Sequence, residues 1–123
     1  MKFSEKYVPK GLSESDARKQ RRSIREGTPR PRVDYPYKRS KWVRAFEERY
    51  GEPITNMSFV DRHLMTRTGA QHVLDKGMAA YYSSGSRPNT TPQQWAYARL
   101  ASVLMGGPAR KVDADLYERF RRK

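Results

Sequence analysis

The sequence has no cysteine among its 123 residues. Disulfide bonds, thiolate metal ligands and a cysteine nucleophile are therefore excluded. The sequence also has no apolar run near the roughly 20 residues that cross a bilayer. Residues 1–10 lack the apolar centre of a secretory signal. We therefore expect an intracellular protein without a signal peptide and without a membrane partner.

Large apolar residues are scarce. Leu, Ile, Val and Phe number 19, about 15% of the chain, and so low a fraction in a highly charged chain is typical of disorder. Only five of the 19 precede residue 41, whereas fourteen follow it together with both tryptophans. We therefore expect a basic arm over residues 1–40 and a compact helical domain over residues 41–123.

Acidic residues are half as numerous as basic ones. Lys and Arg total 26 against 13 Asp and Glu, which gives a formal net charge of +13. The excess is +8 in residues 1–50, +2 in residues 51–108 and +3 in residues 109–123. So many positive charges repel one another, and a bound polyanion lowers this repulsion. Phosphate backbones are the commonest polyanions that basic proteins meet.

Capping residues and helix breakers predict six helices. A Ser, Thr, Asn or Asp precedes each apolar stripe of helical spacing, and Gly or Pro follows several of them. The helices are expected at about residues 14–26, 41–50, 57–64, 69–82, 92–105 and 114–122. The predicted caps are Ser13, Ser40, Asn56, Thr68, Thr91 and Asp113. The predicted fold class is all-α: a small single domain of about five short helices, with a basic, Pro-rich, largely extended N-terminal arm that carries the helix at about 14–26.

The helix predicted at 92–105 carries a single charged residue. A helix that is apolar on most of its circumference belongs at the centre of a fold, so we expect Trp95 and Leu100 to be buried there with Trp42 nearby. Gly77 lowers the helix propensity of its own segment by about 1 kcal/mol relative to Ala. We expect the close approach of a neighbouring helix to compensate.

Four arginines lie at positions i, i+3, i+4 and i+7 of the first predicted helix, and therefore on one face. They are Arg18, Arg21, Arg22 and Arg25. Four like charges on one face repel one another, and bound phosphates would reverse that effect. The alternative is a helix face that is merely solvated.

Cations also alternate with prolines and tyrosines over residues 28–41 and gather at residues 121–123. The predicted phosphate contacts in these segments are Arg30, Arg32, Lys38, Arg39, Lys41, Arg121, Arg122 and Lys123. Tyr35 and Tyr37 could stack on unpaired bases, or could pack on the core of the protein instead.

Two weaker patterns complete the candidate sites. A possible anion-binding loop comprises Ser83, Ser84, Ser86 and Arg87, just before a predicted helix N-terminus, although an ordinary capped turn is the simpler interpretation. His63 and His72 are the only histidines, and His63 is expected to be a packed core residue because no third ligand completes a metal site. We expect no catalytic residues, no metal, no cofactor and no small-molecule substrate.

Two stretches resemble a known family: YVPKGLSESDARKQRRSIREGTPRP continuing to RSKWVRAFEERYG (7–51), and AAYYSSGSRPNTTPQQWAYARLASVLMGGPARKVD (79–113). They are similar to an uncharacterised family of short basic proteins of large DNA viruses and tailed phages. The resemblance implies a viral origin and assigns no functional residues. It implies location in the host cytoplasm or nucleus, or in a virion.

The sequence therefore favours a non-enzymatic nucleic-acid-binding accessory protein, with either RNA or DNA as partner. Its basic N-terminal helix, arm and C-terminal tail would contact the phosphate backbone. One alternative is a minor structural protein of the capsid or virion that binds other protein subunits. Another alternative is a small viral protein that docks on a host protein.

Overall fold

The protein is described from a computed structural model, which places residues 7–8, 11–31, 40–84 and 90–122. These residues form seven α-helices and no β-strand, which confirms the all-α class. The helices are α1 (Glu14–Glu26), α2 (Lys41–Tyr50), α3 (Met57–His63), α4 (Arg67–Ser84), α5 (Pro92–Leu104), α6 (Pro108–Val112) and α7 (Ala114–Phe120).

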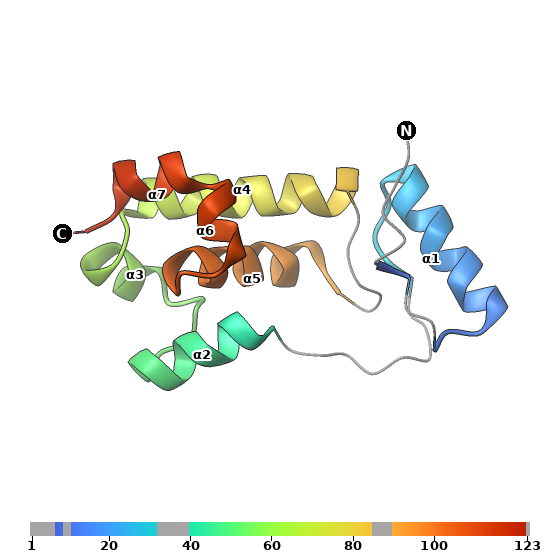
Figure 1. Ribbon diagram of the computed structural model, residues 1–123, viewed down its shortest axis with the longest axis horizontal. Coiled ribbons are helices and arrows are strands. Elements are labelled where there is room, and N and C mark those ends of the chain that lie inside the picture. The colour runs from blue at the N-terminus through green and yellow to red at the C-terminus, as the bar shows by residue number, and fades with distance from the viewer. Residues whose placement is uncertain (1–6, 9–10, 32–39, 85–89, 123) are drawn as a thin grey trace.

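The two central helices, α4 and α5, run in opposite directions and pack most closely against each other (Figure 1). Gly77 makes this approach possible, because a Cβ atom there would lie 2.7 Å from the Cα of Ala96. The close approach that the sequence predicted at Gly77 is therefore confirmed.

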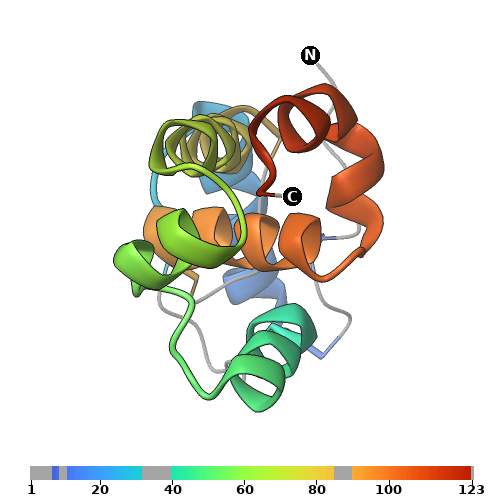
Figure 2. The same ribbon diagram turned by 90° about the vertical axis from the view of Figure 1, so that its left-hand side faces the viewer.

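The remaining helices of the core cover this pair. In both views α5 lies between α4 and α2 (Figure 1, Figure 2), while α3 and α7 pack on α4, and α6 packs on α5. Phe46, Val60, Val73, Leu100 and Val103 are fully buried and belong to one apolar cluster. Every member of that cluster lies within residues 41–123.

Helix α1 lies at one end of the molecule, next to the C-terminal end of α4 (Figure 1). Its buried side consists of Gln20, Ser23 and Ile24. Ser13 begins the helix by accepting a hydrogen bond from the Asp16 N–H, and Gly27 ends it in the left-handed conformation. The bounds predicted from these two capping residues are the observed ones.

Helix α4 is longer than predicted at both ends. Thr66, rather than Thr68, caps it, since its Oγ1 accepts a hydrogen bond from the Gly69 N–H. At the other end, the Ser83 hydroxyl donates to the carbonyl of Ala79 within the helix. Ser83 and Ser84 therefore belong to α4 and not to the loop in which the sequence placed them.

The sequence pattern predicts no helix between those at 92–105 and 114–122, so α6 is a difference from that expectation. Pro108 instead begins a new five-residue helix. Asp113, predicted to cap the next helix, makes no side-chain capping bond. Its carboxylate is buried and paired with Arg99, as described below.

Two further predictions about the core are wrong. Trp95 is only half-buried, and its ring lies edge-on to Tyr7 at a centroid distance of 5.3 Å. It therefore packs against Tyr7, whereas Leu100, which is buried as predicted, belongs to the apolar cluster. His63 is exposed and packs only its ring on Phe59.

Candidate nucleic-acid interface

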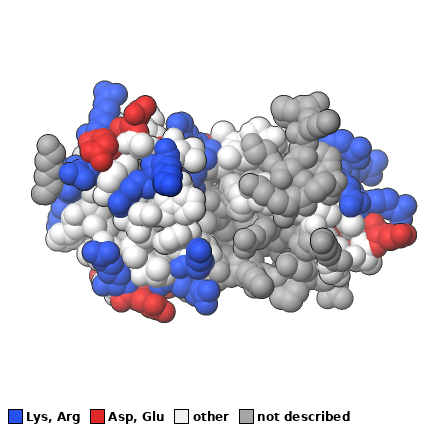
Figure 3. All heavy atoms as spheres, in the orientation of Figure 1, with Lys and Arg blue, Asp and Glu red and all other residues white. Residues whose placement is uncertain are grey.

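The outer face of α1 carries three exposed arginines, Arg18, Arg22 and Arg25. Arg21 is half-buried and has a partner of its own. Basic and acidic side chains both appear at this end of the molecule (Figure 3). Because the opposite face is packed on the protein, the helix is held with these arginines outward.

The acids of α1 do not neutralise that face. The helix contains five cations and three acids, of which Glu14 and Asp16 lie in the first turn. Glu26 lies 3.4 Å from Arg22, and the two side chains are 74% and 56% exposed. An ion pair this exposed stabilises a protein by about 1 kcal/mol or less, so a phosphate can take the place of the carboxylate.

Arg30 does not belong with these surface cations. It is only 8% exposed, and its guanidinium lies 4.7 Å from the ring centroid of Tyr81. Nη2 donates to the carbonyls of Thr28 and Tyr81, and the backbone N–H donates to the Tyr81 hydroxyl. The structure therefore corrects the prediction of a phosphate contact here: Arg30 fastens the residues after α1 to α4.

The C-terminal arginines differ from each other. The Arg122 side chain pairs with the Asp61 carboxylate at 3.3 Å and donates to its carbonyl, and the Arg122 N–H donates to Leu64. Arg122 thus holds the chain end against the turn after α3. Arg121 is more loosely held, with Glu118 at 3.9 Å.

The other predicted contacts divide in two. Lys41 is exposed and its Nζ lies 5.0 Å from the ring centroid of Trp42. The other predicted site residues lie outside the described ranges: Arg32, Tyr35, Tyr37, Lys38, Arg39, Ser86, Arg87 and Lys123.

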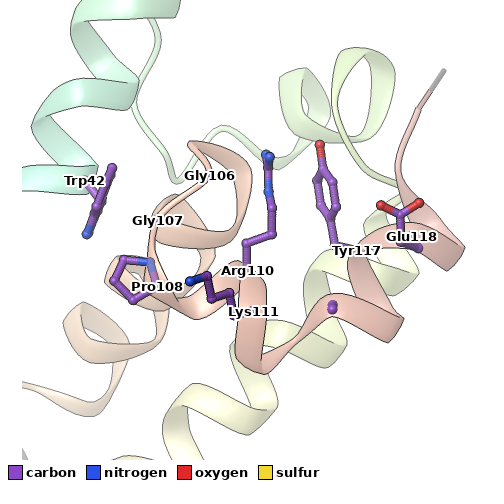
Figure 4. A pocket seen from close by; sticks show the side chains of 9 residues that line it. Trp42, Gly106, Gly107, Pro108, Arg110, Lys111, Tyr117 and Glu118 are labelled. Carbon is purple, nitrogen blue, oxygen red and sulfur yellow. The ribbon is translucent and has the colours of Figure 1, made fainter.

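A hollow that sequence reasoning missed lies between α2 and the pair α6–α7. Its volume is about 580 Å³, and its lining is mostly apolar. Figure 4 shows Trp42 on one side of the Gly106–Pro108 turn, with Arg110 and Tyr117 on the other. Gly107 allows this arrangement, because a Cβ there would lie 2.6 Å from the Trp42 ring.

Arg110 is fixed in the wall of this hollow. Its guanidinium lies 4.0 Å from the ring centroid of Tyr117. Its Nε and Nη2 donate to the carbonyls of Val103 and Leu104 at 2.8 and 3.0 Å. These carbonyls belong to the last two residues of α5, and that of Val103 also accepts from the Gly106 N–H. Arg110 therefore ties α6 to the end of α5 and is held in one position.

A buried ion pair fixes the junction of α6 and α7. Arg99 donates to both Asp113 carboxylate oxygens, at 2.7 and 2.8 Å, and Lys76 lies 3.6 Å away. The hydrogen bond to Asp113 raises the pKa of Arg99 above its ordinary value, burial opposes the rise, and the carboxylate charge adds to it. The guanidinium therefore stays charged wherever the protein is folded.

Two other kinds of site are absent from the described part of the chain. No group of three or more His, Asp or Glu side chains there could hold a metal ion. No helix there is both long and apolar enough to cross a membrane.

Comparison with known proteins places the chain in a family without giving it a function. No curated protein and no solved structure matches it. A family model matches residues 7–119, from the residues before α1 to the last turn of α7. Because that match covers nearly the whole chain, the protein belongs to the family of unknown function DUF5824.

Proposed function

We propose that this chain is a non-enzymatic nucleic-acid-binding accessory protein of viral origin. The observation that carries the binding proposal is the outer face of α1, where Arg18, Arg22 and Arg25 are exposed while the inner face is packed on the protein. The viral origin rests on the sequence resemblance of residues 7–51 and 79–113.

The geometry of the helix suits a phosphate backbone. At a rise of 1.5 Å per residue, Arg18 and Arg25 are separated by about 10 Å along the axis. That length meets several phosphates of either a duplex or a single strand. Each phosphate contact releases counterions, so binding through this face should weaken steeply as salt is added.

The test is the salt dependence of binding. Replacing Arg18, Arg22 and Arg25 together by Gln keeps good helix formers and removes three charges. Measured by fluorescence anisotropy on single-stranded DNA, the slope of log affinity against log salt should lose about 2 units, near 0.7 for each phosphate contact. The triple variant should melt no lower than the wild type, because repulsion on the face is relieved.

A matched control separates this face from net charge alone. Arg44, Arg49 and Arg62 are also exposed and lie on α2 and α3, so their replacement by Gln removes the same charge elsewhere. We expect the control to keep most of the slope. An equal loss in both variants would contradict a role specific to α1, and tight binding to a capsid or host protein that ignores salt would favour the protein-binding alternatives.

A further inference from the structure

We infer that one double-stranded nucleic acid lies along the molecule and contacts two arginine groups, one at each end of α4. The first group is the outer face of α1. The second, the α4-start arginines, comprises Arg67, Arg119 and Arg121. The inference deepens the proposed function and rests on it, because it names a duplex as the partner and adds a second contact surface.

The α4-start arginines come together through a backbone contact between the start of α4 and the end of α7. The Thr66 N–H donates to the Phe120 carbonyl at 2.9 Å. Arg67 follows Thr66 in the sequence, and Arg119 and Arg121 flank Phe120. The three arginines therefore share one end of the molecule, although two of them are more than 50 residues from the third.

Carboxylates leave most of this positive charge available. All three arginines are exposed. The Arg67 guanidinium donates to the Ser58 hydroxyl and that of Arg119 lies over an aromatic ring, so neither pairs with a carboxylate among the described residues. Arg121 lies 3.9 Å from Glu118, and the two side chains are 40% and 68% exposed. An ion pair this open is worth little, so a phosphate can take the place of the carboxylate.

Asp61, which also lies near the start of α4, is already engaged. Its carboxylate pairs with Arg122 at 3.3 Å and accepts a hydrogen bond from the Arg67 backbone N–H. Its charge therefore offsets that of Arg122, which for this reason is not one of the α4-start arginines.

The two arginine groups lie at opposite ends of α4 (Figure 1). Thr66 caps its start. Gly27, which ends α1, approaches the other end, since a Cβ there would lie 3.1 Å from the carbonyl oxygen of Tyr82. Thr66 and Tyr82 are 16 positions apart, or about 24 Å at a rise of 1.5 Å per residue. A ligand that touches both groups must span at least that distance.

A duplex fits two contact groups at a fixed spacing better than a single strand does. At 3.4 Å per base pair, 24 Å corresponds to about seven base pairs. A duplex of that length is a straight rod, because DNA bends appreciably only over about 150 base pairs. A single strand would lose conformational freedom when it is held extended over the same distance. Figure 3 shows Lys and Arg side chains at both ends of one face, as a rod lying on that face requires.

The experiment compares two DNA duplexes, of 15 and five base pairs, each closed at one end by an uncharged linker. The shorter one is about 17 Å long and cannot reach both groups. In the variant, Arg67, Arg119 and Arg121 are replaced by Gln. By fluorescence anisotropy on the longer duplex, the slope of log affinity against log salt should lose about 2 to 3 units, near 0.9 for each phosphate contact. On the shorter duplex, which the five cations of α1 should hold, the slope should not change.

Two controls separate position from charge and from folding. Replacing the α4-start arginines by Lys retains the charge and should retain the slope on both duplexes. Lys41, Arg44 and Arg49 are exposed on α2, so their replacement by Gln removes three charges elsewhere and should also retain the slope. Thermal melts of the three variants show whether each is folded.

The outcomes separate this inference from the proposal beneath it. An unchanged slope of the Gln variant on the longer duplex would overturn the second contact surface and leave phosphate binding by α1 intact. An equal loss on both duplexes would overturn the span, since five base pairs cannot touch both groups. If the wild type bound neither duplex, the proposed function itself would be overturned.

Discussion

Asp113 contacts cations on two other helices and joins α6 to α7. Its carboxylate is fully buried, receives two hydrogen bonds from Arg99 on α5 and lies 3.6 Å from Lys76 on α4. Its backbone joins α6 to α7. Asp113 therefore connects four helices: its carboxylate binds cations of α4 and α5, and its backbone joins α6 to α7.

Removal of that charge should be costly. Asp113→Asn leaves the Arg99 guanidinium, whose side chain is 19% exposed, without an anionic partner. Breaking one side of a buried ion pair costs about 3–5 kcal/mol, so we expect urea denaturation to show a loss of about 3 kcal/mol. Asp115→Asn, two residues along and exposed, should change stability by less than about 0.5 kcal/mol. Equal effects would contradict the central role of Asp113.

The acid–base behaviour of this pair follows from the raised pKa of Arg99. A cation whose folded-state pKa is raised stabilises the protein fully below its unfolded pKa, and that contribution falls only as pH rises through the folded value. For Arg99 the ordinary pKa is already far above neutral pH, and the folded-state pKa is higher still. Its stabilisation is thus fully present at neutral pH.

Among the elements, α4 and α5 approach each other so closely at Gly77 that a side chain there would not fit. Gly77→Ala gains about 1 kcal/mol of helix propensity, yet its methyl would lie 2.7 Å from the Ala96 Cα. The two helices must then separate, and overpacking of this kind costs about 1–3 kcal/mol. We expect a net loss of stability in denaturant titrations.

A second substitution on the same helix calibrates that result. Ala79 is exposed on α4, so Ala79→Gly measures the helix-propensity effect alone and should cost about 1 kcal/mol. Stabilisation by Gly77→Ala of the same size would show that the helices are not held together at Gly77.

The helix bounds that could be predicted from sequence depend on local chemistry. Ser13, Ser40, Asn56 and Thr91 each cap a helix through a side chain that accepts a hydrogen bond within three residues. Both partners of such a hydrogen bond are close in the sequence, so the sequence alone can predict it. The pairing of Asp113 cannot be predicted in this way, because its partner Arg99 lies 14 residues away on another helix.

In the candidate interface, too, features that depend on neighbouring residues can be predicted and features that depend on distant partners cannot. The arginine face of α1 follows from helical spacing, and the structure does expose three of its four members. The burial of Arg30 could not be predicted, because its partner Tyr81 is 51 residues away. Trp42 and Tyr117, which both line the hollow, lie far apart in the sequence, and the close approach of Gly107 to Trp42 is a contact between different helices that spacing does not reveal.

At the scale of the whole molecule, the apolar cluster and α1 are separate. The cluster lies within residues 41–123, whereas α1 adds one large buried apolar residue, Ile24. We expect a fragment of residues 41–123 to keep its helical circular dichroism and a cooperative melt at a lower midpoint. A gradual, non-cooperative melt would contradict the division into an arm and a domain.

The fragment also bears on the proposed α1 contact. It lacks the α1 face, so it should bind single strands more weakly than the full chain. In Figure 1, α1 lies beyond the end of α4, and α6 and α7 lie over its other half.

The burial of Asp113 has a practical consequence for purification. Salt screens exposed charges strongly and buried pairs much less. On the proposed function, about 1 M salt should therefore strip nucleic acid from the open α1 face while the Arg99–Asp113 pair keeps the helices assembled. A salt wash would then free the protein of any polynucleotide, with no denaturation and refolding step.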